Sequence, residues 1–207
     1  MLMKIKSYIL ILIGLSISFA AGSQDLQTGF VEELRQSTAG VESISCRLTQ
    51  TRAMSVLVKE DVKAGKFYYL RPGNILLSFD DGDYILMTDS HFRMKSGNKK
   101  NSMKISSNPM LKELKNLLTA CMTGDISMIS KGFDMELAED GGSYSLKLVP
   151  EDKRAASRIS AIELVFDARD MSLAKLEMVE PTGDFTRYEF TDKVFNKELD
   201  PSVFDLK

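Results

Sequence analysis

Few side chains of this sequence have the types and spacing needed for catalysis or metal binding. The 207 residues include one histidine, His91, and two cysteines, Cys46 and Cys121. The usual Ser/His/Asp and Cys/His catalytic groups and most zinc sites need an imidazole beside other reactive side chains. His91 has no second histidine, no cysteine and no HExxH-like spacing nearby, so we expect an exposed polar residue there. We therefore expect no enzyme, no metal site and no cofactor.

Charged clusters give equally weak signals for chemistry. Asp80, Asp81 and Asp83 lack the DxDxDG spacing and the distal glutamate of a calcium loop, and a hairpin turn at Gly82 explains them better. Residues 97–104 predict a solvated basic loop, with contact to an anion or a partner as the alternative. A net charge of -2 without a long basic run excludes an electrostatically driven nucleic-acid binder.

Residues 1–22 have the layout of a secretory signal peptide. Lys4 and Lys6 precede an apolar stretch over residues 8–20, and small residues follow, so we expect cleavage after Ala20 or Gly22. An uncleaved anchor is the weaker alternative, because spanning a bilayer takes roughly 20 apolar residues. No cysteine stands near the cleavage point for lipid attachment. We expect residues 23–207 to form one free, soluble domain.

The two cysteines of such an exported chain could form a disulfide, but the sequence does not require one. Cys46 alternates with Ile44 and Leu48 as on a half-buried strand, and Cys121 lies on the apolar side of a predicted helix. Cysteine is often a small core residue, so two buried free thiols are the simpler expectation.

Periodicity predicts two amphipathic helices among many short strands. Residues 25–37 carry one apolar stripe, and a second helix begins at Pro109, after a cap at Ser107 or Asn108, and ends before Gly124. The second helix has a wide apolar face formed by Leu111, Leu114, Leu117, Leu118, Cys121 and Met122.

Alternating apolar residues between turn sequences predict ten or eleven strands joined mostly by hairpins. Sequential hairpins in this number curl into a barrel or a strongly bent sheet, whose concave face is the natural place for the two apolar helix stripes. The expected strands cover residues 44–48, 62–70, 75–79, 84–88, 92–94, 133–137, 144–148, 162–166, 173–180 and 185–191.

Two features point to ligand binding. The chain has 12 methionines, whose flexible side chains suit ligands of variable shape such as acyl chains, although core filling is the alternative. On the strand over residues 65–71, alternation places Phe67, Tyr69 and Arg71 on one face. Arg71 could there reach carbonyls at the end of a covering helix or the ester oxygens of a ligand, or it could be an ordinary surface arginine.

Four segments, in this order, carry a family resemblance. They are Leu48-Thr49-Gln50-Thr51 in the first strand, the Gly-to-Pro strand over residues 65–72, residues 75–79, and the closing segment 194–204 with Asn196, Leu199, Asp200 and Phe204. Their order and spacing resemble the LolA family of periplasmic outer-membrane lipoprotein carrier proteins over nearly the whole mature chain.

The resemblance implies a mainly β (α+β) fold, an unclosed antiparallel half-barrel of about 11 strands with helices over its concave face. It also implies a periplasmic chaperone of a Gram-negative type envelope that shuttles lipoproteins from the inner to the outer membrane, with Arg71 holding a helical lid closed. The expected partners are acylated lipoproteins, an inner-membrane lipoprotein-releasing transporter and an outer-membrane acceptor, and we expect a monomer. A lipid-sensing or protein-binding module without transport is the alternative. The expected ligand-binding residues are Phe67, Tyr69, Arg71, Ile75, Leu77, Phe79, Leu114, Leu118 and Met122.

Overall fold

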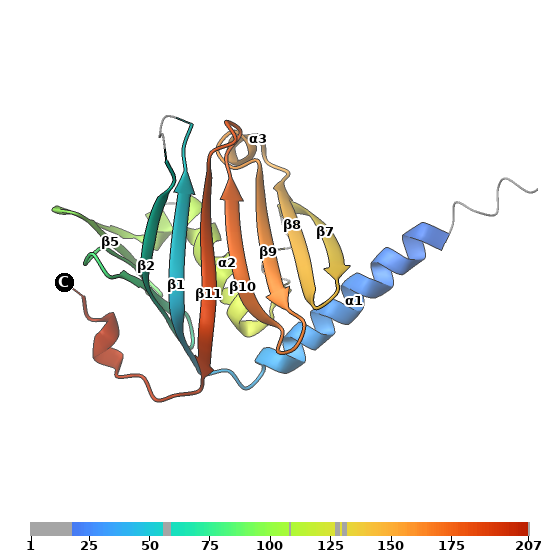
Figure 1. Cartoon of the computed structure of the whole chain (residues 1–207), viewed down its shortest axis with the longest axis horizontal. Coiled ribbons are helices and arrows are strands. Elements are labelled where there is room, and N and C mark those ends of the chain that lie inside the picture. Colours follow the sequence, from blue (N-terminus) through green and yellow to red (C-terminus); the bar gives the residue numbers. More distant parts are fainter. Residues whose placement is uncertain (1–17, 56–58, 108, 127–128, 130–131, 207) are drawn as a thin grey trace, which may run out of the picture.

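A computed structural model describes residues 18–55, 59–107, 109–126, 129 and 132–206, and one large antiparallel sheet dominates it (Figure 1). The eleven strands follow the order β6-β5-β4-β3-β2-β1-β11-β10-β9-β8-β7. The prediction of a mainly β fold with an unclosed sheet is confirmed. The strands are β1 (Ser43–Ala53), β2 (Asp61–Leu70), β3 (Asn74–Phe79), β4 (Tyr84–Met87), β5 (His91–Ser96), β6 (Lys99–Lys104), β7 (Phe133–Asp140), β8 (Ser143–Pro150), β9 (Ala161–Asp167), β10 (Ser172–Val179) and β11 (Phe185–Phe195).

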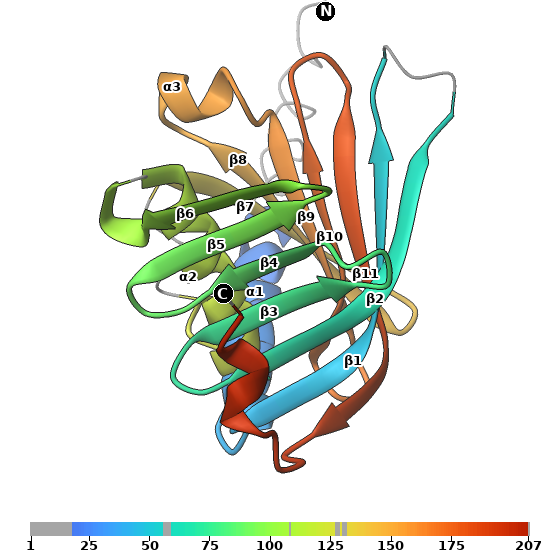
Figure 2. The same ribbon diagram turned by 90° about the vertical axis from the view of Figure 1, so that its left-hand side faces the viewer.

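Two hairpin meanders meet at the centre of this sheet. Strands β1 to β6 form one arm, strands β7 to β11 form the other, and β1 pairs with β11 to join them. The outer strands β6 and β7 are the two ends of the sheet, and the chain between them forms the helix α2 (Pro109–Thr123). The sheet bends around this helix, as Figure 2 shows.

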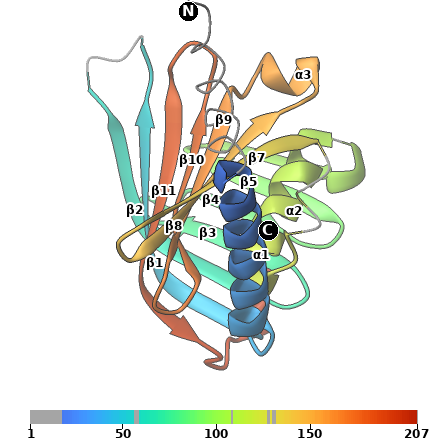
Figure 3. The same ribbon diagram turned by 90° about the vertical axis from the view of Figure 1, so that its right-hand side faces the viewer.

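The longest helix, α1 (Ser18–Thr38), lies across the opening beside α2 (Figure 3). It begins earlier than the predicted residue 25 and includes both predicted cleavage points, so cleavage stays a prediction while residues 1–17 lie outside the described part. Within the described residues, no helix is both long and apolar enough to cross a membrane. Shorter helical segments include η1 (Ile105–Ser107), α3 (Lys153–Ala156) and η3 (Pro201–Phe204).

The core lies between the concave face of the sheet and the two long helices. Inward-facing residues alternate most regularly along β9, where Ile162, Leu164 and Phe166 are buried and their neighbours are less so. From α1, Phe30 and Leu34 enter the same cluster, and α2 contributes its apolar face. The alternation of apolar residues in the strands thus makes the concave face of the sheet apolar, and the two helices cover it.

The basic loop predicted over residues 97–104 is wrong in its extent. Residues 99–104 form the edge strand β6, which pairs with β5 from Ser96–Lys99 to His91–Lys104. Its side chains are mostly exposed, and only Met103 packs against the core. An edge strand needs no apolar alternation on its outer face, so its composition resembles that of a loop.

The predicted aspartate turn and the free thiols agree with the structure. Asp81 and Asp83 flank the β3–β4 turn at Gly82, where Lys63 Nζ lies 2.7 Å from an Asp81 oxygen and 2.5 Å from an Asp83 oxygen. Both cysteines are free and buried. His91 is half-buried, and its Nδ1 is 2.7 Å from the Ser90 hydroxyl.

A second apolar cluster covers the convex face of the β1–β6 arm. Phe204 of η3 packs there with Leu76, Tyr84 and Leu86. Arg93 of β5 donates a hydrogen bond of 2.8 Å to the Leu206 carbonyl, which holds the residues after η3 against this face. The C-terminal segment therefore crosses the outer surface of this arm (Figure 2).

The close approach of β3 to β2 requires glycine at position 65. A Cβ atom added to Gly65 would meet the Ser78 carbonyl oxygen and the Phe79 Cα at distances far below van der Waals contact. The clash involves backbone atoms of the next strand, which cannot rotate away as a side chain can.

We therefore expect Gly65→Ala to lower the free energy of unfolding by about 1–3 kcal/mol, as overpacked sites do. Gly40→Ala is the matched control, because a Cβ atom there meets nothing within 4 Å, and its effect should stay within about 0.5 kcal/mol. Urea unfolding of the two variants measures the difference, and equal stabilities would contradict this account of the close approach between β2 and β3.

Candidate functional site

Helix α1 is attached to the far arm of the sheet by one aromatic side chain. The Phe30 ring lies between Tyr144 of β8 and Phe166 of β9, with centroid distances of 5.2 and 5.3 Å. Tyr144 also donates a hydrogen bond of 3.4 Å to Glu33. Below this contact, Leu34 is fully buried. The helix thus rests on β8 and β9 through its apolar stripe.

The end of α1 is attached to the opposite arm by Arg71. The arginine follows β2, and its Nε donates a hydrogen bond of 2.9 Å to the Val41 carbonyl. Its Nη2 donates one of 3.4 Å to the carbonyl of Thr38, the last residue of the helix. A cation is well placed at a helix C-terminus, where unpaired carbonyls carry partial negative charge. Glu42, 3.5 Å from the Arg71 Nε, adds an ion pair.

A cavity of about 290 Å³ lies directly under this end of α1. Thr38 and Val41, which accept the hydrogen bonds of Arg71, belong to its wall. Apolar side chains supply most of the remaining surface, and Ser172 and Asp170 stand at one side. The apolar members of the wall are Val41, Ile44, Cys121, Met122, Leu173 and Phe195.

A smaller hollow of about 10 Å³ adjoins the cavity and shares five lining residues with it. It reaches deeper into the half-barrel, to Phe67 of β2 and Phe190 of β11. The two rings pack edge to face at a centroid distance of 5.1 Å. Lys193 also borders this hollow. The site is therefore an apolar space bordered by the Lys193 ammonium group, and Arg71 holds the end of α1 over it.

The structure places the predicted ligand-binding residues at different depths. Met122 lines the cavity and Phe67 lines the adjoining hollow, whereas Leu114 is only partly buried. Their ligand-binding role stays a prediction. The other apolar residues of the set lie in the same buried cluster without bordering either space, and they are Tyr69, Ile75, Leu77, Phe79 and Leu118.

Sequence reasoning missed the wall contributed by β10 and β11. Ser172, Leu173, Lys193 and Phe195 border the cavity or its adjoining hollow. The first three stand in no recognisable motif, and Phe195 lies in the closing segment without having been predicted as a wall residue. The strand pattern alone gave no signal, because irregular pairing decides which of these side chains turn inward. Register shifts lie at both places, in β10 and in β11.

The two thiols and one hydroxyl of the core indicate that water is excluded from it. Burial raises the pKa of Cys121 and of Cys46 to about 12. The Tyr69 hydroxyl is buried and has no hydrogen-bond partner among the described residues. A buried hydroxyl without a hydrogen-bond partner lowers the stability of the folded protein. The interior around Cys46, Tyr69 and Cys121 is thus shielded from water.

This geometry agrees with the match to a family model. The model for the outer membrane lipoprotein carrier protein LolA covers residues 39–207. The chain belongs to the LolA family. No curated protein matches the sequence.

Solved structures share the fold of this LolA-family chain at low sequence identity. An uncharacterized conserved protein from Thermus thermophilus is 8% identical, with a TM-score of 0.54, over 88% of this chain and 94% of that one. MucB is 13% identical, with a TM-score of 0.51, over 90% of this chain and 63% of that one. A DUF1329 family protein from Desulfovibrio piger is 12% identical, with a TM-score of 0.50, over 88% of this chain and 97% of that one. At these identities the likeness concerns the fold alone.

If Arg71 holds the end of α1 over the cavity, Arg71→Leu will expose Cys121, a buried wall residue. Hydrogen bonds from a charged donor are worth about 1.5–3 kcal/mol, so alkylation of Cys121 should accelerate by about tenfold or more. The measurement is the rate of N-ethylmaleimide modification in a Cys46→Ala background.

Arg47→Leu serves as the control, because Arg47 is an exposed arginine on the outer face of β1. It should leave the alkylation rate unchanged. Equal rates for Arg71→Leu and Arg47→Leu would show that Arg71 does not hold the cover closed.

The raised thiol pKa values also predict a pH dependence of stability. In the folded state Cys121 keeps its proton up to about pH 12, whereas in the unfolded state it loses the proton near pH 9. Between these values the folded state binds more protons, so stability falls as pH rises, by about 1 kcal/mol per pH unit for one thiol. Urea unfolding at pH 8 and pH 10 should give a smaller loss for Cys121→Ala than for the wild type. An identical loss in both proteins would contradict the shift.

Proposed function

We propose that this chain is a periplasmic carrier that shelters the acyl chains of lipoproteins and moves them from the inner to the outer membrane. Membership in the LolA family supports lipoprotein clients. The observation that carries the proposal is the Arg71 latch over an apolar cavity, because only a few polar contacts hold the helix end there. The carrier is not an enzyme in this proposal.

The cavity must enlarge to accept its cargo. Its volume of about 290 Å³ is at the lower end of the range for pockets that enclose one small ligand, about 300–1,000 Å³. A lipoprotein carries several acyl chains, so α1 and α2 must move away from the concave face. Lys115 of α2 forms an ion pair of 3.0 Å with Asp89, and this pair has to break if α2 moves away.

The energies favour a reversible exchange. Each buried CH₂ group contributes about 0.8 kcal/mol, so acyl chains can replace the helix stripes as the cover of the concave face. Opening costs the hydrogen bonds of Arg71 and exposes apolar surface of α1 and α2 to water. A carrier works when the two states are close in free energy, since a partner at each membrane can then shift the population. The proposed partners are an inner-membrane lipoprotein-releasing transporter and an outer-membrane acceptor.

Native mass spectrometry of the purified protein with a triacylated lipopeptide tests the proposal. We expect a one-to-one complex, and none with the same peptide lacking acyl chains. Arg71→Leu should bind the lipopeptide more tightly, by up to about tenfold, because a larger fraction of the protein is already open. Arg47→Leu is again the control and should bind as the wild type does.

Absence of any complex with the acylated peptide would overturn the carrier and favour a protein-binding module on the same half-barrel. Transport itself is tested by depleting the protein in the bacterium that encodes it. Newly made lipoproteins should then accumulate in the inner-membrane fraction, and binding without this accumulation would indicate a lipid-sensing module.

A further inference from the structure

A β-bulge near the end of β11 decides which side chain enters the site. Residues 45–47 of β1 lie opposite residues 191–194, so one residue of β1 faces two of β11, Asp192 and Lys193. Strict alternation from the buried Phe190 would turn Asp192 inward and Lys193 outward. Instead, Asp192 has a φ of 53° and is exposed, whereas Lys193 borders the hollow inside. Bulges of this kind commonly redirect a side chain next to a functional site.

The inward ammonium group has one hydrogen bond within the described part of the chain. Lys193 Nζ donates to the Ser172 hydroxyl at 2.7 Å. Ser172 is 8% exposed, and its hydroxyl donates to an Asp170 carboxylate oxygen at 2.5 Å. The serine proton is therefore directed away from the lysine, an arrangement that presents a cation rather than an activated nucleophile. An ammonium group has three N–H donors, so two of them can take oxygen atoms of a ligand.

Nearby charges neutralise Lys193 only in part. Asp170 and Asp167 both attract its charge, but Asp170 contacts it only through the Ser172 hydroxyl. Asp167 is paired with Arg169, whose Nη2 is 2.5 Å from it. No carboxylate lies within 4.0 Å of the Lys193 ammonium among the described residues. Burial lowers the pKa of Lys193, which indicates that the charge stands in a poorly hydrated position. An anionic or carbonyl oxygen would stabilise it there.

We propose that Lys193 binds the carboxyl oxygen at the head of an acyl chain whose tail lies along the apolar wall formed by Ile44, Met122, Leu173 and Phe195. The ligand class is an acyl chain with a carboxyl head, either the ester of a lipoprotein or the carboxylate of a free fatty acid. The inference deepens the proposed function and rests on it, since it names the group that orients the cargo. Apolar lining with one fixed cation suits such an amphipathic ligand.

Competition with the uncharged dye N-phenyl-1-naphthylamine measures binding of three probes, palmitic acid, 1-hexadecanol and a triacylated lipopeptide. Lys193→Met keeps an unbranched side chain, one atom shorter, and removes the charge. This substitution should lower the affinity for palmitic acid about tenfold or more. The affinity for 1-hexadecanol, which lacks a carboxyl group, should stay unchanged. Lys193→Arg should restore most of the affinity, which also shows that the position tolerates replacement.

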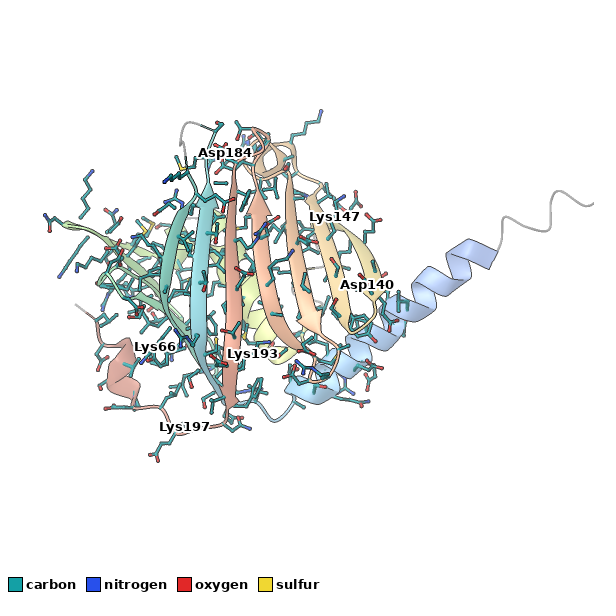
Figure 4. The ribbon with its side chains drawn as sticks, in the orientation of Figure 1. Lys66, Asp140, Lys147, Asp184, Lys193 and Lys197 are labelled. Carbon is teal, nitrogen blue, oxygen red and sulfur yellow. The ribbon has the colours of Figure 1, made fainter. Side chains whose placement is uncertain are left out.

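Lys66→Met is the matched control, because Lys66 is an exposed lysine of β2, labelled together with Lys193 in Figure 4. It should bind every probe as the wild type does. A loss for palmitic acid alone assigns the site to free fatty acids, and a loss for the lipopeptide as well assigns it to lipoprotein esters. Unchanged binding of both by Lys193→Met would overturn the inference while leaving the carrier intact. Failure of the wild type to bind the lipopeptide would instead overturn the carrier.

Discussion

The concave face of the sheet is apolar from one arm to the other, and water must be kept from it. A closed barrel would solve this by itself, but this sheet ends at β6 and β7 without joining them. The cover therefore has to come from α1 and α2, whose apolar stripes fit the same surface. Because the burial is non-directional, an acyl chain satisfies the face as well as a leucine stripe does. The need for a cover and the ability to exchange it have the same physical origin.

Polar contacts fix where the exchangeable cover sits. Arg71 binds the end of α1 from the β2 side, Glu33 binds its middle to Tyr144 of β8, and Lys115 holds α2. None of these contacts adds greatly to stability, since each replaces hydrogen bonds to water. They choose one arrangement among many apolar ones of similar free energy, and in the proposed carrier a partner would displace the cover without unfolding the sheet.

Regular patterns in the sequence were sufficient for most of the fold. Alternation over β1 to β5 and β7 to β11, and the 3.6-residue stripes of the two helices, gave the element order and the covered face. Arg71 was also identifiable, because it follows an inward-facing Phe67 and Tyr69. The edge strand β6 was not, since an exposed strand needs no apolar alternation. Lys193 could not be found either, because the bulge that turns it inward depends on pairing with β1 and leaves no mark in the strand's own composition.

The pairing of β1 with β11 has a further consequence for how the molecule is assembled. Each arm is built from hairpins between neighbouring segments, but the strands at the centre pair residues as far as 151 positions apart, Ile44 with Phe195. Local hairpins form before such distant contacts, which must first overcome the entropy of closing a long loop. Until β11 is in place, β1 and β10 expose open hydrogen-bonding edges, the features that promote aggregation. We therefore expect the pairing of β1 with β11 to form last, and the cavity between the sheet and α1 is complete only when this pairing is in place.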